Sequence, residues 1–525
     1  MKKIKVFALL ATLFVGIFSN LFTPVVSAED TSGNATVKIH KLQGKNGPIV
    51  NTGKELSGFT ASDFLDGVTF EVYDVTTAYH AKYNEVYTST TAQDADDAAR
   101  AHVQGTAGHA PTVSGATLVG TPQVTANGGV ATFSLPKTSN GKNAVYVFVE
   151  KPKTGIQRAE SNLVLSFPVY ELNSNGSYTD TELTVIHLYP KNITETITPE
   201  KDITTKNEDT AGHNNYNVGK EIGFKLSTLI PANIGIKEVD GVTPHYNTFG
   251  LIDTHDTTLT FNPAGTHELK VAGTSVVLSE GETADYTIVV GEPAVEGKDT
   301  FKVKLTQEGI NKLAEQGGKT LEFTYTMKLN AQAVMDEKNV NKVTVEYGRK
   351  TDDFNDVVTT PGNEKEVYTG GYRFIKTDVS TNKPLANAEF VVRDAASAGK
   401  YLKIDDKTKE ISWVGTYGEA TKFTTGDDGI VDIKGLTYGT YYLEETKAPT
   451  DYVKLSDRIA FDVKFNSYTA RTTTTPTEVK EHNVANTPKG FLPSTGGAGI
   501  ILFVALGAAM VGLAGVYFTS RRKDA

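Results

Sequence analysis

The sequence predicts an all-β protein built from three tandem immunoglobulin-like β-sandwich domains. Its 525 residues exceed what one hydrophobic core usually organises, so about three domains of roughly 100 to 200 residues are expected. Thr, Val, Tyr and Gly are frequent, and alternating runs such as 35–42 and 183–189 are typical of half-buried strands. Helical patterns are few, with one at 306–316 and a weaker one at 92–102. Sandwich domains are therefore favoured.

The composition excludes several classes of function. Net charge is −10 without acidic blocks, and no basic stripe lies between the two ends of the chain, so nucleic-acid binding is not expected. The ten histidines show no metal-ligand spacing, and no nucleotide-binding loop or catalytic triad is visible. We therefore expect no metal, no cofactor and no enzyme. Cysteine is absent, so disulfides cannot stabilise the chain.

The N-terminal segment has the features of a secretory signal peptide. Three lysines precede an apolar stretch at 6–22, and small residues at 26–28 offer a cleavage site. The sequence thus predicts a signal peptide at 1–28, with cleavage after Ala28.

The C-terminal segment combines three features. An uncharged apolar run of 19 residues at 500–518 is long enough to span a bilayer, and the basic residues at 521–523 would stay on the inner side. A plain single-pass anchor would need no more than these. Directly before them stands a pentapeptide made of Leu492, Pro493, Ser494, Thr495 and Gly496. The set resembles the cell-wall sorting signal of Gram-positive bacteria. This resemblance implies that a sortase thiolate attacks the Thr495–Gly496 carbonyl and holds the chain as a thioester until an amine resolves it.

An internal repeat relates the two ends of the mature chain. Each copy has a strand-like run with a lysine, a glycine-led run, a run ending in glutamate, and an asparagine 42 or 41 residues further on. The lysine-to-glutamate spacing is 109 in the first copy and 69 in the last. The first copy should therefore carry roughly forty extra residues, expected at 76–126 as surface loop insertions.

The domain boundaries are expected near residues 195 and 367. The stretches 194–199 and 358–363 have the composition of short linkers. The predicted parts after the signal peptide are 29–195, 196–367, 368–490 and a sorting segment at 491–525.

A lysine, an asparagine and a carboxylic acid on adjacent strands can form an intramolecular amide bond. Burial keeps the amine neutral and the carboxyl protonated, so that the acid polarises the carboxamide and ammonia leaves. Such a bond would do the work of a disulfide and could not be reduced.

The segment 441–452, with the sequence YYLEETKAPTDY, resembles the E-box of pilins and related wall-anchored adhesins. The Cna-B-type domains of that family carry Lys–Asn isopeptide bonds. In the last domain the resemblance implies a bond between Lys376 and Asn486, promoted by Glu445. Through the internal repeat it implies a second bond in the first domain. That bond joins Lys41 to Asn192 and is promoted by Glu150, although the first copy lacks the Thr-x-Ala-Pro of the box.

The middle segment resembles the Cna-A-type sandwich of pilins. In that type a lysine on the first strand, an aspartate midway and an asparagine on the terminal strand react. Lys201, Asp253 and Asn341 fit this order, and Asp256 and Asn339 are the alternatives.

A further motif, Tyr189-Pro190-Lys191, resembles the pilin motif at the end of the first domain of backbone pilins. It ends a predicted strand just before a linker, where Pro190 stops strand pairing. The resemblance implies that Lys191 attacks the thioester at Thr495 of another copy. One donor end and one acceptor lysine per subunit give an open head-to-tail filament.

These features together predict the major shaft subunit of a sortase-assembled pilus on the cell surface. Expected partners are a pilus-specific sortase, identical subunits, minor pilins at tip and base, peptidoglycan and a host surface ligand. One alternative is a monomeric wall-anchored adhesin in which Lys191 is idle and the 76–126 insertion binds host matrix. Another is an accessory pilin at the tip or base.

Overall fold

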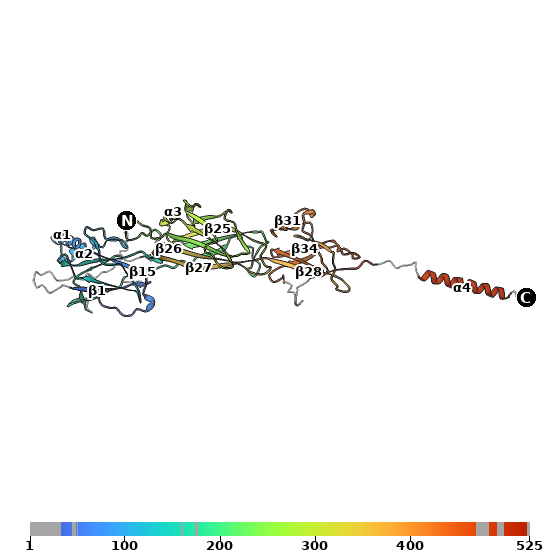
Figure 1. The fold of residues 1–525 in the computed structure, drawn as a ribbon, viewed down its shortest axis with the longest axis horizontal. Coiled ribbons are helices and arrows are strands. Elements are labelled where there is room, and N and C mark those ends of the chain that lie inside the picture. The colour runs from blue at the N-terminus through green and yellow to red at the C-terminus, as the bar shows by residue number, and fades with distance from the viewer. Residues whose placement is uncertain are drawn as a thin grey trace, which may run out of the picture. The chain divides into compact units, whose positions relative to one another are not determined.

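A computed structural model describes residues 33–44, 49, 51–158, 161–173, 177–468, 482–490 and 498–521. The predicted signal peptide and the pentapeptide 492–496 lie outside these residues. The described chain is mostly β-strand (Figure 1) and falls into two compact units. The first comprises 1–214, 220–333 and 338–367, and the second comprises 215–219, 334–337 and 368–525. The predicted all-β class is confirmed.

The first unit begins with a sandwich at 34–194, here called the N-terminal sandwich. One sheet has the order β14-β1-β6, a second β11-β9-β3-β4 with β5 also on β3, and a third β10-β15-β2. Their bounds are β1 Asn34–His40, β2 Leu42–Gln43, β3 Thr69–Asp74, β4 Thr117–Leu118, β5 Gln123–Val124, β6 Val130–Pro136, β9 Val145–Glu150, β10 Ile156–Arg158, β11 Leu163–Ser166, β14 Val185–Leu188 and β15 Lys191–Thr194. Smaller pieces are η1 Ala61–Asp63, β7 Thr138–Ser139, β8 Lys142–Asn143, β12 Tyr170–Leu172 and β13 Tyr178–Glu182.

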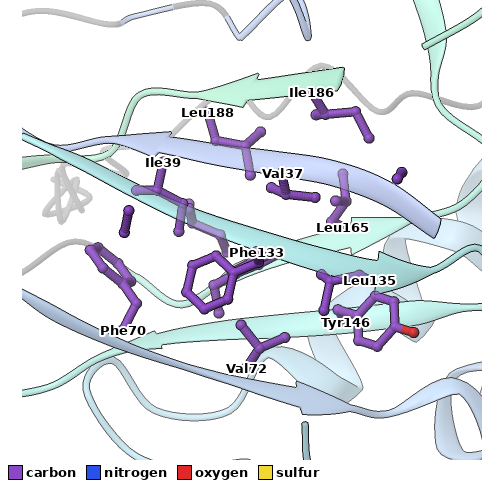
Figure 2. Packing of buried hydrophobic residues seen from close by; sticks show 14 of the residues in the cluster. Val37, Ile39, Phe70, Val72, Phe133, Leu135, Tyr146, Leu165, Ile186 and Leu188 are labelled. Carbon is purple, nitrogen blue, oxygen red and sulfur yellow. The ribbon is translucent and has the colours of Figure 1, made fainter. Parts of the chain in front are cut away.

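The core of this sandwich follows from strand alternation. In β1 the residues Val37 and Ile39 are buried while their neighbours Thr36 and Lys38 are half-buried, as expected when successive side chains point to opposite faces. Figure 2 shows side chains of β1, β6 and β14 facing those of β3 and β9 across the core. The first strand β1 pairs in parallel with the late strand β14.

The insertion expected as loops at 76–126 is largely helical, so that expectation was wrong. Helices α1 (Thr76–Tyr87) and α2 (Ala92–Gln104) fill its first half, and the weak helical pattern at 92–102 is confirmed. Tyr79, Tyr83, Ala95, Ala99 and Val103 pack against the outward valines of β9. Within each helix these residues recur at a spacing of four, so they lie on one face of that helix. Tyrosine and alanine give a weak hydrophobic signal, which is why α1 was missed.

The first unit also holds the middle sandwich, at 200–367. Its sheets have the orders β16-β18-β25-β21-β22, with β20 on β25, and β17-β27-β26-β19-β24-β23. Their bounds are β16 Glu200–Ile203, β17 Asn214–Asn215, β18 Glu221–Leu229, β19 Thr248–Asp256, β20 Leu259–Phe261, β21 Glu268–Val271, β22 Val277–Leu278, β23 Tyr286–Val290, β24 Lys298–Leu305, β25 Thr320–Leu329, β26 Asn339–Thr351 and β27 Phe354–Tyr368. The helix expected at 306–316 is present as α3 (Gln307–Lys312) and η2 (Ala314–Gln316), and the Thr306 side chain caps α3 by accepting from the Gly309 N–H.

The stretch 358–363 is not a linker, contrary to expectation, because it lies inside β27 and pairs with β26. The register shifts between Lys342 and Thr344, where Pro361 is paired. A Cβ on Gly362 would lie 2.1 Å from the Pro199 carbonyl oxygen. The Pro-Gly pair that suggested a turn instead marks an irregularity in a strand and a close backbone approach.

The second unit contains the C-terminal sandwich, at 370–486. Its sheets have the orders β33-β28-β36 and β31-β30-β29-β34-β35, with β32 on β29. The bounds are β28 Gly370–Asp378, β29 Glu389–Arg393, β30 Tyr401–Ile404, β31 Ile411–Val414, η3 Tyr417–Glu419, β32 Phe423–Thr424, β33 Ile430–Leu436, β34 Gly439–Lys447, β35 Ile459–Val463 and β36 His482–Asn486. The first strand β28 pairs in parallel with the last strand β36, much as β1 pairs in parallel with the late strand β14 in the N-terminal sandwich.

The C-terminal apolar run lies within a single helix, α4 (Ala498–Arg521). The side chains described in it are 504–515 and 517. Across the described part of the chain, no helix has both the length and the apolar character required to cross a membrane.

Candidate functional site

The N-terminal sandwich brings Lys41, Glu150 and Asn192 together. Lys41 follows β1, Glu150 ends β9, and Asn192 lies in β15, which pairs in parallel with β2. The Lys41 Nζ donates to Glu150 Oε2 at 2.6 Å and to Asn192 Oδ1 at 2.8 Å, and Asn192 Nδ2 donates to Glu150 Oε1. All three side chains are buried. The glutamate therefore contacts both the amine and the carboxamide nitrogen.

The C-terminal sandwich repeats this arrangement with Lys376, Glu445 and Asn486. The Lys376 Nζ donates to Asn486 Oδ1 and lies 3.6 Å from Glu445 Oε1. Asn486 Nδ2 donates to Glu445 Oε1 at 2.9 Å and Oε2 at 3.2 Å. Burial lowers the pKa of Lys376 to about 8 although Glu445 acts in the opposite direction. A larger share of the amine is then neutral than in water.

The middle sandwich holds Lys201, Asp253 and Asn341 in a different arrangement. Lys201 Nζ donates to Asp253 Oδ2 at 2.5 Å and to the Tyr325 hydroxyl at 2.9 Å. Asn341 Nδ2 donates to the same hydroxyl at 3.4 Å and to Met327 Sδ at 3.2 Å. Each of these five residues is buried. A tyrosine hydroxyl thus stands between the acid and the carboxamide.

The buried Lys201–Asp253 pair is electrostatically coupled. Burial lowers the pKa of Lys201 to about 8, partly offset by Asp253. Burial alone would raise the pKa of Asp253, but Lys201 and His255 outweigh it and lower that pKa. The pair therefore rests as an ion pair, and a proton must pass from Lys201 to Asp253 before the amine can attack.

The two alternative residues for the middle site lie in other contacts. Asp256 accepts from Lys298 and, at 2.6 Å, from the Val340 backbone N–H. Asn339 Nδ2 donates to the Val367 carbonyl at 2.9 Å. The geometry favours Asp253 and Asn341.

The motif Tyr189-Pro190-Lys191 follows β14. Lys191 and Asn192 are consecutive in β15, so their side chains point to opposite faces. Asn192 is buried against Lys41, whereas Lys191 is half-buried. The strand that supplies the internal asparagine thereby turns the neighbouring lysine away from the internal site.

Tyr189 is held by residues that sequence reasoning missed. Its ring stacks on His40 with centroids 4.6 Å apart and on Phe59 at 5.5 Å. Its hydroxyl accepts from the Leu56 N–H at 2.8 Å, and its own N–H donates to Asn51 Oδ1 at 2.7 Å. The segment 51–59 thus packs directly on the motif, and no signal in the sequence indicated this.

His40 and His187 form a buried pair beneath the same tyrosine. Their Nε2 and Nδ1 atoms are 2.9 Å apart and the rings stack. Burial lowers the pKa of both histidines, and for His40 the charge of His187 adds to this effect. Because at most one proton can lie between the two facing nitrogens, both rings cannot be protonated at the same time.

The fold and these groupings define a class of protein, namely a multi-domain all-β chain whose buried Lys–acid–Asn sets have the composition needed for internal amide bonds. Residues 32–193 match the family described as Gram-positive pilin subunit D1, N-terminal domain. Residues 370–478 match a prealbumin-like fold domain, and residues 486–525 match the LPXTG cell wall anchor motif.

Two curated relatives and one solved structure are similar to the chain. The trypsin-resistant surface T6 protein of Streptococcus pyogenes serotype M6 is 26% identical over 408 residues, which is 62% of this chain and 74% of the relative. The fimbrial subunit type 2 of Actinomyces naeslundii is 26% identical over 362 residues, covering 63% of this chain and 60% of that subunit. The full-length RrgB pilus protein of Streptococcus pneumoniae shares the fold, with a TM-score of 0.56, 18% identity, and coverage of 89% of this chain and 100% of RrgB.

The chain therefore carries a domain that matches the N-terminal domain of Gram-positive pilin subunits, a prealbumin-like domain and an LPXTG cell wall anchor motif. It is accordingly a protein of the cell surface, anchored to the wall.

Proposed function

We propose that this chain is the shaft-forming subunit of a covalently polymerised pilus. A sortase cleaves Thr495–Gly496 and holds the chain as a thioester at Thr495. The Lys191 amine of an adjacent subunit then attacks that carbonyl, so that an amide bond forms and the sortase thiol is released. The fimbrial and pilus relatives support this proposal.

The observation that carries the proposal is the half-buried position of Lys191 beside a buried Asn192. One strand separates a lysine for bonds between subunits from an asparagine for a bond within the subunit. Because each subunit offers one such lysine and one sorting signal, the product is a linear chain.

The same proposal includes an internal bond in each sandwich. The pairs are Lys41 with Asn192, Lys201 with Asn341 and Lys376 with Asn486, promoted by Glu150, Asp253 and Glu445 respectively. The contacts in each buried group support it. The corresponding domain limits are 29–195, 196–367 and 368–490. Minor pilins at tip and base, and a host ligand, remain predictions.

The test of polymerisation is the Lys191→Arg variant, which keeps the charge but offers no neutral amine. Lys38→Arg is the matched control, because Lys38 is also a half-buried strand lysine of the N-terminal sandwich. Wall extracts boiled in SDS are immunoblotted. We expect a high-mass ladder from wild type and the control, and only monomer from Lys191→Arg.

An unchanged ladder in Lys191→Arg would contradict the proposed joint. A wild-type chain that runs only as a wall-linked monomer would instead favour the adhesin alternative.

A further inference from the structure

The three internal sites differ in how the acid reaches the asparagine. In the terminal sandwiches one glutamate contacts both the lysine and the carboxamide nitrogen, as Glu150 does with Lys41 and Asn192. In the middle sandwich Asp253 contacts Lys201, but Asn341 Nδ2 meets the Tyr325 hydroxyl instead. Aspartate is one methylene shorter than glutamate, and the Tyr325 hydroxyl lies between the Asp253 carboxyl group and Asn341 Nδ2.

The Tyr325 hydroxyl touches all three reacting groups. It donates to Asp253 Oδ2 and accepts from Lys201 Nζ at 2.9 Å and from Asn341 Nδ2 at 3.4 Å. Asn341 Oδ1, in contrast, is buried and has no hydrogen-bond partner among the described residues. The carboxamide is therefore held from its nitrogen, which is the atom that must leave.

We propose that Tyr325 is a catalytic residue of the middle site, relaying a proton from Asp253 to the departing nitrogen of Asn341. The proposal rests on the Lys201–Asn341 bond of the proposed function and adds a residue that neither terminal site uses in this way.

The steps balance without any further reactant. After the proton of the ion pair has moved to Asp253, the neutral Lys201 amine attacks Asn341 Cγ, and the Nζ–Cγ bond forms. Tyr325 gives its hydroxyl proton to Nδ2 and takes the proton of Asp253. The Cγ–Nδ2 bond breaks, ammonia leaves, and Asp253 regains a proton from Nζ. Tyr325 ends as it began, whereas Asp253 changes from the carboxylate of the ion pair to a neutral carboxyl group, because ammonia leaves uncharged.

The surroundings keep Tyr325 in place and protonated. The residue is buried, and its ring is stacked with Phe224 and Phe323 at centroid distances of 5.8 and 5.4 Å. Burial, reinforced by Asp253, raises the pKa of the phenol well above its usual value. A phenol that does not ionise remains a donor and can pass a proton along only as an equal one arrives.

His255 fixes the direction of the relay. Its Nδ1 contacts Asp253 Oδ1 at 2.7 Å, which occupies one carboxyl oxygen. The other, Oδ2, is left to face both Lys201 and Tyr325. The carboxyl therefore has one oxygen for orientation and one for proton transfer.

The test compares Tyr325→Phe with Tyr347→Phe, both in the full mature chain. Tyr347 is another buried tyrosine of the middle sandwich, on the strand that carries Asn341. Tyr347→Phe therefore removes one tyrosine hydroxyl from the same sandwich, as Tyr325→Phe does, and serves as the matched control. Samples taken over time after synthesis are digested, and the cross-linked Lys201–Asn341 peptide is quantified by mass spectrometry. We expect the bond to form at least about 100-fold more slowly in Tyr325→Phe, the usual effect of losing a general acid. Tyr347→Phe should behave as wild type.

Three results distinguish the possibilities. Formation at the wild-type rate in Tyr325→Phe would overturn the relay while leaving the bond itself intact. Absence of the cross-linked peptide from wild type would overturn the proposed middle bond, and the relay with it. Should Tyr325→Phe lack the bond, the added change Asp253→Glu decides between relay and misfolding. A longer carboxyl that reaches Asn341 directly should restore the bond, whereas failure to restore it would count against the relay.

Discussion

The terminal sandwiches and the middle sandwich each bury a lysine, an acid and an asparagine together, but they arrange these side chains differently. At both ends, parallel pairing of the first strand region with the last places a lysine beside an asparagine, and a glutamate from a central strand closes the triangle. In the middle, Lys201 and Asn341 come from different sheets, and an aspartate with a tyrosine fills the space between them. The amine is buried at all three sites, whereas the group in contact with the carboxamide nitrogen is a glutamate at the two ends and a tyrosine hydroxyl in the middle.

The largest effect should follow from removing a promoting acid at a terminal site. In Glu445→Ala the internal bond does not form, and the sandwich loses a cross-link between residues 110 positions apart. The chain-entropy estimate for such a loop is about 4–5 kcal/mol of unfolding free energy. Thermal unfolding of the purified mature chain should show the transition of the C-terminal sandwich well below that of wild type.

The control for this variant is Glu444→Ala. Glu444 neighbours Glu445 on the same strand and accepts from Arg393, which is buried, and from the half-buried Arg458. Its loss should cost about 1–3 kcal/mol, less than the loss of the cross-link. Equal losses in the two variants would contradict a special role for Glu445.

A second effect, dependent on pH, should appear only where the lysine is left unbonded. In Asn486→Ala, Lys376 stays buried as an amine whose pKa is lowered to about 8, against about 10.4 in the unfolded chain. Between these values the unfolded state binds more protons, so stability rises with pH. The gain should be about 3 kcal/mol and is absent below pH 8. In wild type the proposed bond turns this nitrogen into an amide, which should not titrate.

Denaturant unfolding of both proteins between pH 7.5 and 10.5 provides the measurement. A stability difference between Asn486→Ala and wild type that does not narrow with rising pH would argue against a buried neutral amine at this site.

The smallest expected effect concerns the His40–His187 pair under the pilin motif. Burial lowers the pKa of both below the usual 6.5, so the unfolded state binds more protons as the pH falls below that value. Stability is therefore lost on acidification below about pH 6.5. In His187→Gln one of the two depressed titrations is gone, and the fall between pH 6.5 and 5 should be shallower. Thermal unfolding of the N-terminal sandwich, measured between pH 6.5 and 5, tests this. Equal losses of stability with falling pH in wild type and His187→Gln would contradict a contribution from the histidine pair.

Much of the molecule could be predicted from its sequence because strand alternation and an internal repeat are local signals. Lys41, Glu150 and Asn192 were found by matching them to Lys376, Glu445 and Asn486, which works when two sandwiches share one strand order. The choice between Asp253 and Asp256 depended on which face of β19 each occupies, and that between Asn339 and Asn341 on register with β19. Neither is visible in the sequence alone.

Other features had no sequence signal strong enough to find them. Tyr325 is one of several buried residues that alternate along β25, and only its contacts with Lys201, Asp253 and Asn341 distinguish it. Helix α1 buries tyrosines, whereas leucines at the same positions would have given a clear helical periodicity of hydrophobic residues. Pro361-Gly362 has the composition of a turn, yet pairing with β26 keeps it in a strand.

The mass of the purified mature chain shows whether the three internal bonds form, because each Lys–Asn bond releases one ammonia. We expect a deficit of about 51 Da from the sequence mass, or about 17 Da for each of three bonds, together with three cross-linked peptides that join Lys41 to Asn192, Lys201 to Asn341 and Lys376 to Asn486. A chain with the full sequence mass and no cross-linked peptide would contradict this expectation.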